Sequence, residues 1–320
     1  KEPQVRTLRN RLRTKWGEQD ADERVLHFDI QREAELFAGW SEDKDYESSR
    51  GLDYYVNEAN GIDIIIGGPP CQAYSVAGRV RDEKGMADDY RNFLFEHYLA
   101  IVDRYQPDLF IFENVPGILS AAPHGKKVSE IIQKEFSKKD YEITSKLKGA
   151  IVNAADYNVP QNRKRVILVG IRRKSFKDID IQKMLDDFYK QILPSHKCEN
   201  VLTVKDAIGM LPPLEPYWDE EHHSKRKSHS VPNCDVTWHV PRYNNLRDMD
   251  TFKLLAEDLE SGKNEYDSKK IAELYEKKVG AKSPIHRYHV LNPNEPSTTI
   301  IAHLHKDGNR FIHYDSKQAR

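Results

Sequence analysis

The chain has 320 residues and a formal net charge of −1, with 38% hydrophobic and 32% charged residues. This length allows one large domain or two smaller ones, and the balanced charge excludes a protein that is basic over its whole surface. No apolar run approaches the roughly 20 residues that span a bilayer. The three scattered cysteines exclude a disulfide framework and a paired-cysteine zinc site, so we expect no metal. The polar residues 1–24 predict a cytoplasmic protein without a signal peptide.

Apolar runs alternate with helical patterns in the first half of the chain. Residues Val25–Ile30 and Ile62–Gly67 predict short buried strands. The apolar residues of Asn92–Tyr105 share one helical face, and a strand is predicted at Leu109–Phe112, closed by Glu113 and the residues after it.

The same alternation continues toward residue 171. Residues Val128–Phe136 predict an amphipathic helix, Tyr141–Lys148 a strand and Val166–Ile171 a buried strand. Strands and helices in this order predict an α/β fold with a mostly parallel sheet and helices on both faces. In such sheets the functional residues lie beyond the carboxyl ends of the strands.

The sequence becomes less regular after Arg172. We predict a catalytic domain over residues 1–171, a second and irregular domain over 172–284, and a segment over 285–320 that returns toward the first. The stretch Thr251–Val279 predicts one or two charged helices. Four histidines of the irregular domain lack the paired cysteines and regular spacing of a zinc site: His222, His223, His229 and His239.

Three groups of residues predict chemistry. Cys71 follows Gly67-Gly68-Pro69-Pro70, and a thiol on a rigid loop after a strand can act as a nucleophile, although most cysteines are structural. Glu113 stands after a strand, where it could cap a turn, act as a general acid or hydrogen-bond a ring nitrogen. Arg163 and Arg165 alternate at the start of a strand, so they would point to one side and could clamp an anion or a base carbonyl.

These groups, in this order, resemble the motifs of the C5-cytosine DNA methyltransferase family. The resemblance rests on five stretches: "HFDI" ending at Asp29-Ile30, "GPPCQAYS" around Cys71, "DDYRNFLFE" over Asp88–Glu96, "FENVPG" over Phe112–Gly117 and "AADYNVPQNRKRVILVG" over Ala154–Gly170. A single Pro-Cys pair would be weak, but five motifs in sequential order at strand and helix edges are specific.

The resemblance implies a Rossmann-like methyltransferase fold and a covalent mechanism that uses S-adenosylmethionine. Cys71 would attack C6 of a flipped-out cytosine, Glu113 would hydrogen-bond N3 and the exocyclic amine, and Arg165 with Arg163 would bind the base carbonyl and orient Glu113. The residues implied to bind the cofactor are Asp29, Ile30, Pro70 and Leu94. Those implied to bind DNA are Gln72, Ser75, Arg79, Arg81 and Lys84, and residues 172–284 would form the target-recognition domain, with the cations Arg172, Arg173, Lys174, Lys225, Arg226, Lys227, Arg242 and Arg247 as candidate contacts.

The chain departs from the family pattern at both ends. No Phe-x-Gly-x-Gly loop precedes Asp29, and the stretch Leu36–Trp40 ("LFAGW") is a weak imitation of it. The family's closing helix and its cofactor-contacting Asn do not follow Arg320, so we expect these residues alone to bind the cofactor poorly.

The implied partner is double-stranded DNA, methylated at one specific sequence by a monomer that is cytoplasmic and associated with the nucleoid. A restriction endonuclease would act on the same site without binding the methyltransferase. The alternatives are a tRNA cytosine-C5 methyltransferase, a non-catalytic DNA-binding remnant and a thiol hydrolase. No His at a matching strand end supports the last.

Overall fold

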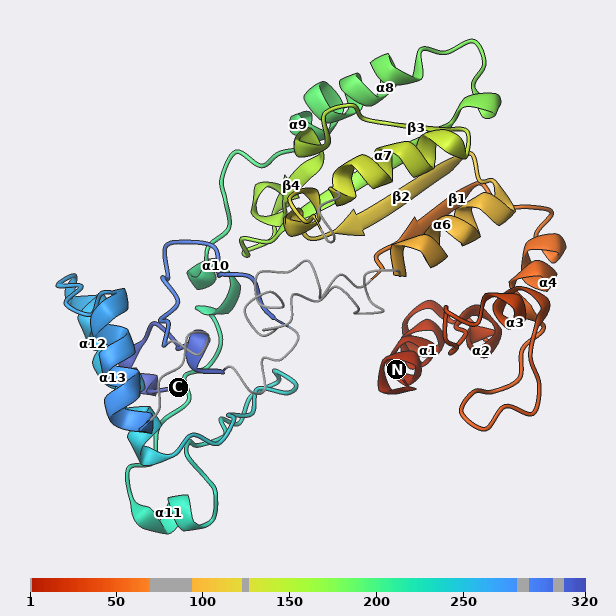
Figure 1. The fold of residues 1–320 in the computed structure, drawn as a ribbon. Coiled ribbons are helices and arrows are strands. Elements are labelled where there is room, and N and C mark those ends of the chain that lie inside the picture. The colour runs from red at the N-terminus through yellow and green to blue at the C-terminus, as the bar shows by residue number, and fades with distance from the viewer. Residues whose placement is uncertain (1, 70–93, 123–126, 281–287, 302–307) are drawn as a thin grey trace. The chain divides into compact units, whose positions relative to one another are not determined.

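The computed structural model describes residues 2–69, 94–122, 127–280, 288–301 and 308–320 (Figure 1). The chain forms two compact units, the first made of Lys1–Ile151 with Arg165–Ser195 and the second of Val152–Lys164 with His196–Arg320. The predicted boundary after residue 171 falls inside the first unit. Among the described residues, no helix has both the length and the apolar character to cross a membrane.

The first unit is built on a sheet in the order β1-β2-β5-β3, which puts β1 (Ile64–Gly67) beside β2 (Leu109–Asn114). Strand β5 (Lys164–Arg172) follows, then β3 (Tyr141–Ile143), and the short β4 (Ile151–Asn153) also pairs with β5. The predicted α/β class is confirmed. The parallel direction holds for β1 with β2, whereas β5 runs antiparallel to both β2 and β3. Between β3 and β5 the chain forms β4 flanked by short 3₁₀ turns, and not the α-helix that usually connects parallel neighbours.

Helices α6 (Leu94–Tyr105) and α7 (Val128–Lys138) lie over one face of this sheet, which confirms both predicted helices (Figure 1). The core between them is aromatic: Phe110 of β2 stacks on Phe136 of α7 with ring centres 4.1 Å apart. Besides short 3₁₀ turns, the described residues of this unit also form α1 (Glu2–Trp16), α2 (Ala21–Arg24), α3 (Glu33–Ala38), α4 (Gly51–Glu58), α8 (Ile181–Asp187), a π-helical turn (Phe188–Ile192) and α9 (Leu193–Ser195).

The π-helical turn closes the free edge of β5. Strand β3 pairs with β5 only as far as Gly170. Beyond that point, the Tyr189 hydroxyl donates to the Ile167 carbonyl at 2.8 Å and accepts from the Val169 amide at 2.9 Å. One side chain therefore satisfies two backbone groups that a neighbouring strand would otherwise bond.

Two predicted strands differ from the structure. Residues Val25–Ile30 form a loop and a turn, because the Val25 carbonyl accepts from the Arg9 guanidinium and the Asp29 carboxylate accepts from the Gln31 amide. The Val25 carbonyl and the Gln31 amide are backbone groups that a neighbouring strand could bond, and here side chains satisfy them. Strand β3 ends at Ile143, and a 3₁₀ turn at Leu147–Ala150 replaces the rest of the prediction.

Strand β1 was predicted to be buried, and alternate residues of it are not. Ile64 is 46% exposed and Ile66 is 72% exposed, whereas Ile65 packs on the core. Among the described residues, the face of β1 that carries Ile64 and Ile66 is therefore only partly covered.

The second unit is mostly loops with a small helical core. Its longer helices in the described residues are α12 (Leu246–Ser261) and α13 (Ser268–Val279), where one or two charged helices were expected over Thr251–Val279, and its short ones are α10 (Val204–Ile208) and α11 (Glu220–Ser224). Phe252 and Leu255 of α12 pack with Tyr288 and Ile312.

The segment just before β5 also belongs to the second unit. The Asn162 amide donates to the Ser297 carbonyl at 2.7 Å, and the Ile300 amide donates to the Gln161 side chain at 3.2 Å. Residues 161–162 are therefore held by residues 297–300, far along the chain.

Candidate active site at the end of strand β2

Glu113 and Arg165 form an ion pair at the carboxyl end of β2. The Arg165 Nε lies 2.7 Å from the Glu113 Oε1, and the two side chains are 20% and 40% exposed. Strand register explains the pairing: Glu113 lies opposite Ile167, so Arg165 is its diagonal neighbour on the same face of the sheet. The structure thus brings together two of the four predicted catalytic residues.

Gly68 lies directly against this carboxylate. A Cβ added to Gly68 would be 2.9 Å from the Glu113 Oε2, which is closer than such contacts normally come. The glycine therefore allows the chain leaving β1 to pass beside the carboxylate. The sequence signal was the paired glycines before Cys71, which we had interpreted as loop residues and not as space for Glu113.

Asn114 links the ends of β1 and β2. Its side chain is 3% exposed, its Oδ1 accepts from the Val115 amide at 2.9 Å, and its Nδ2 approaches the Pro69 carbonyl at 3.4 Å. Because Pro69 precedes Cys71 by two residues, Asn114 holds the start of the segment that carries the thiol. Asn114 stands within the "FENVPG" stretch, and its role in holding Pro69 could not be predicted from that stretch alone.

Several predicted residues lie outside the described part of the chain. They are Pro70, Cys71, Gln72, Ser75, Arg79, Arg81 and Lys84. Arg163 is described, but it belongs to the second unit, whereas Glu113 and Arg165 belong to the first. Its predicted role beside Arg165 stays a prediction.

Three of the predicted cofactor residues lie in the described part of the chain, and their role toward the cofactor stays a prediction. Asp29 and Ile30 lie in the turn between α2 and α3, where the Asp29 Oδ1 accepts from the Gln31 amide at 3.0 Å. Leu94 begins α6 and is 8% exposed. Gly39 of the "LFAGW" stretch has a structural reason: its φ is +103°, and a Cβ there would lie 2.8 Å from the Arg50 carbonyl carbon.

The eight cations predicted to contact DNA divide into two groups. Five have protein partners in the described residues: Arg172 donates to the Gln106 carbonyl, Arg173 pairs with Glu142, Lys174 with Asp140, Lys225 with Glu221 and Arg247 with Asp248. The other three are Arg226, Lys227 and Arg242. None of these three forms an ion pair within the described part of the chain.

Each of the four histidines weighed as zinc ligands has a hydrogen-bond partner of its own. His222 hydrogen-bonds Asp219, His223 the Tyr217 carbonyl, His229 the Gln318 carbonyl and His239 the Pro212 carbonyl. Across the residues that the structure describes, no three His, Cys, Asp or Glu side chains gather as metal ligands would. These histidines are thus explained by hydrogen bonding inside the protein.

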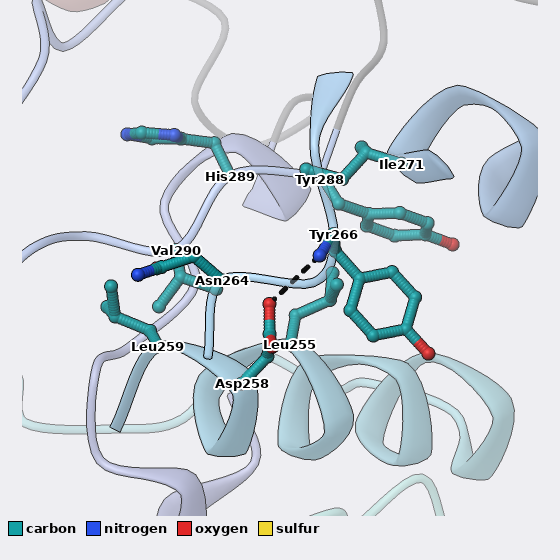
Figure 2. A pocket seen from close by; sticks show the side chains of 9 residues that line it. All are labelled: Leu255, Asp258, Leu259, Asn264, Tyr266, Ile271, Tyr288, His289 and Val290. Carbon is teal, nitrogen blue, oxygen red and sulfur yellow. Dashed lines mark hydrogen bonds between the residues drawn. The ribbon is translucent and has the colours of Figure 1, made fainter. Parts of the chain in front are cut away.

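A pocket of about 150 Å³ lies in the second unit beside α12 (Figure 2). The Asp258 carboxylate in its wall accepts from the backbone amides of Glu265 and Tyr266, at 2.8 and 3.1 Å. Figure 2 shows the second of these bonds. This acid holds the connection between α12 and α13, so its two hydrogen bonds have a structural role.

The α/β sheet thus carries a charged pair near the ends of two neighbouring strands, and comparison with known proteins defines the class of protein. A family model described as C-5 cytosine-specific DNA methylase matches residues 42–315. The chain belongs to this family.

Among its relatives, the type II methyltransferase M.Bpa9945I of Bacillus paralicheniformis is 32% identical over 289 residues, which is 82% of this chain and 61% of that protein. The type II methyltransferase M.XorII of Xanthomonas oryzae is 42% identical over 164 residues, which is 50% of this chain and 33% of that protein. A solved structure of a proposed DNA modification methyltransferase from an Escherichia coli prophage is 27% identical. The match covers 78% of this chain and 66% of the prophage protein's chain, with a TM-score of 0.41. The chain thus spans less than two thirds of these curated relatives.

Proposed function

We propose that the chain supplies the catalytic residues of a DNA cytosine-C5 methyltransferase, with Cys71 as the nucleophile. One observation supports this most strongly: the Glu113–Arg165 ion pair lies against Gly68, three residues before Cys71. An acid, the arginine that orients it and the residues leading to the thiol therefore belong to one end of two neighbouring strands. Family membership supplies the reaction class.

In the proposed reaction, the Cys71 thiolate adds to C6 of cytosine and forms a sulfur–carbon bond. The electron pair of the C5–C6 double bond moves toward C5 and the ring, which makes C5 nucleophilic. Glu113 hydrogen-bonds N3 and the exocyclic amine, where charge changes as the thiolate adds. Arg165 keeps the Glu113 carboxylate oriented and contacts the base carbonyl. Once C5 has bonded the transferred methyl group and still carries its hydrogen, loss of that C5 proton re-forms the C5–C6 double bond and expels the thiolate.

S-adenosylmethionine supplies the methyl group in this family. Of the residues implied to hold it, Asp29 and Ile30 lie in the turn before α3, Leu94 begins α6 and Pro70 lies outside the described residues, so their role toward the cofactor stays a prediction. The chain's own residues account for activation of the base.

The substrate cytosine has to leave the DNA stack before these steps occur. C6 and N3 are covered by stacking and base pairing in a duplex, and enzymes that act on such atoms extrude the base. The Glu113 side chain is 40% exposed, so an extruded pyrimidine can reach its carboxylate.

The test is covalent trapping on a duplex that carries 5-fluorocytosine at the methylated position. That position is found first by mapping 5-methylcytosine in a host that expresses the gene. Fluorine cannot leave C5 as a proton does, so the thiolate stays bound and the complex survives denaturing electrophoresis. We expect wild type to trap and Cys71→Ser not to trap. Trapping by Cys71→Ser would contradict the assigned nucleophile, and trapping on tRNA alone would favour the tRNA alternative.

The monomeric state, the location at the nucleoid, the single recognition sequence and a cognate endonuclease stay predictions. So does the assignment of residues 172–284 as the target-recognition domain.

A further inference from the structure

Three cations of the second unit, Arg226, Lys227 and Arg242, are exposed to solvent. Arg226 lies over the ring of Tyr243, with its guanidinium carbon 5.3 Å from the ring centre. The carbonyl of Arg242 accepts from the Ser228 hydroxyl at 3.3 Å, which places Arg242 beside the residue that follows Lys227. From Lys225 to Tyr243 the sequence has four cations and one acid, Asp235. Lys225 is paired with Glu221, and the other three cations have no carboxylate partner in the described residues.

The same segment presents a tryptophan almost entirely to solvent. Trp238 is 94% exposed and Val240 is 65% exposed, whereas large apolar side chains are normally buried. Trp238 also has a φ of +65°, a left-handed conformation that is rare for a bulky residue. Strained residues of this kind concentrate at functional sites.

The loop that carries Trp238 is held in place at the next residue. The His239 Nε2 hydrogen-bonds the Pro212 carbonyl at 2.7 Å, and the Val240 amide donates to the Trp238 carbonyl at 2.8 Å. Pro212 is close in sequence to Met210, which is 97% exposed. The hydrogen bond from His239 therefore connects the loop of the exposed Trp238 to the stretch that carries the exposed Met210.

We propose that Trp238 and Met210 contact bases of the DNA target, while Arg226, Lys227 and Arg242 contact its phosphates. This inference rests on the proposed function, which makes DNA the substrate. Charge favours a nucleic acid over a protein partner, because unpaired cations accompany the apolar side chains. Aromatic and methionine side chains contact bases by stacking, by wedging between base steps or by apolar contact with thymine methyl groups.

Selection from a pool of random duplexes tests this surface. Wild-type protein is expected to enrich a sequence motif. Trp238→Ala is expected to lose preference at one or more positions and to bind the enriched duplex about tenfold more weakly, with little change on unrelated duplexes. Trp218→Ala is the matched control, since Trp218 is 45% exposed in the same unit and lies under Lys253. The control should keep both motif and affinity.

The phosphate contacts have a different signature. Arg226→Gln with Arg242→Gln should weaken binding to all duplexes alike and reduce the slope of log affinity against log salt by about 2. A double variant that changes the motif and keeps the salt slope would overturn the assignment of these two arginines.

Two outcomes would overturn the base-contact inference while the proposed function stands. One is a Trp238→Ala protein with unchanged motif and affinity. The other is a Trp238→Ala protein with a lowered Tm and unchanged DNA binding, since Trp238 would then pack against protein. Failure of wild type to bind any duplex would instead contradict the proposed DNA substrate, and the inference would fall with it.

Discussion

Arg165 contacts Glu113 diagonally across strands β5 and β2, with its Nε 2.7 Å from the Glu113 Oε1. The register of the two strands fixes this contact, because Glu113 lies opposite Ile167 and Arg165 is two residues before it. Glu113 is 40% exposed, so burial alone does not set the direction of its carboxylate. The arginine does.

Replacement of Arg165 by Lys tests this orienting role. Lysine keeps the charge but loses the planar guanidinium that fixes a carboxylate, so we expect the rate of trapping on 5-fluorocytosine DNA to fall roughly 10- to 100-fold. The free energy of unfolding should change by less than about 1 kcal/mol, because partly exposed ion pairs contribute little. The control is Arg173→Lys, whose partner is Glu142 at 3.0 Å near the other end of β5. Equal rates for the two variants would contradict the role of Arg165.

Substitution of Gly68 by Ala should displace the Glu113 carboxylate. The new Cβ would lie 2.9 Å from the Glu113 Oε2, and the Gly68 backbone is outside the left-handed region, so alanine itself is tolerated. We expect kcat to fall roughly 10- to 100-fold with a smaller change in KM, since a catalytic group is misplaced. Gly149→Ala is the matched control, because nothing lies within 4 Å of its added Cβ. If Gly68→Ala keeps wild-type kcat, the close approach has no catalytic consequence.

The Tyr189 hydroxyl should contribute measurably to stability. It bonds both the Ile167 carbonyl and the Val169 amide, and burial raises the pKa of Tyr189 to about 12. Tyr189→Phe leaves both backbone groups of β5 unpaired, so we expect a loss of about 1–3 kcal/mol in urea unfolding. Tyr54→Phe serves as the control, because no hydrogen bond joins its hydroxyl to the described residues. An equal, small effect of both changes would contradict the edge-closing role.

Acid should destabilise the second unit through His313. Burial first, and the nearby Arg320 charge second, lower the pKa of His313 from 6.5 to about 4. The unfolded chain therefore binds a proton between pH 6.5 and 4 that the folded chain does not. Stability contributed by neutral His313 is complete above pH 6.5 and is lost as pH falls toward 4, by at most about 3 kcal/mol.

The measurement is the free energy of unfolding as a function of pH for wild type and His313→Gln. The variant should show a shallower fall between pH 6.5 and 4. Some slope should remain, because burial also lowers the pKa values of His229 and His289. Identical slopes in the two proteins would show that His313 is not the titrating group.

Sequence patterns predicted the elements that local residues determine. The apolar faces of α6 and α7, the strand before Glu113 and the alternation of β5 follow from periodicities of 3.6 and 2 residues. The positions of Glu113 and Arg165 at strand ends could therefore be expected. Their contact could not, because it depends on which strands pair and in which register, across 51 intervening residues.

The predictions that differ from the structure also depend on contacts between residues far apart in the sequence. Val25–Ile30 has the composition of a strand, but Arg9 and the Asp29 side chain satisfy groups that a neighbouring strand would bond. The three consecutive isoleucines of β1 look fully buried in the sequence. In the structure only Ile65 packs on the core, and the opposite face with Ile64 and Ile66 is exposed. Gly68 gained a role only when the Glu113 side chain was placed beside it.

The central claim, that Cys71 and Glu113 act on one cytosine, is tested most directly without any methyl donor. Addition of the thiolate to C6 lets C5 take up a solvent proton, so elimination can release the original hydrogen of C5 into water. With DNA labelled with tritium at cytosine C5, we predict that wild type releases tritium, that Cys71→Ser releases none and that Glu113→Gln is slowed at least about 100-fold. Release that persists in Cys71→Ser, or that is unaffected in Glu113→Gln, would contradict the account.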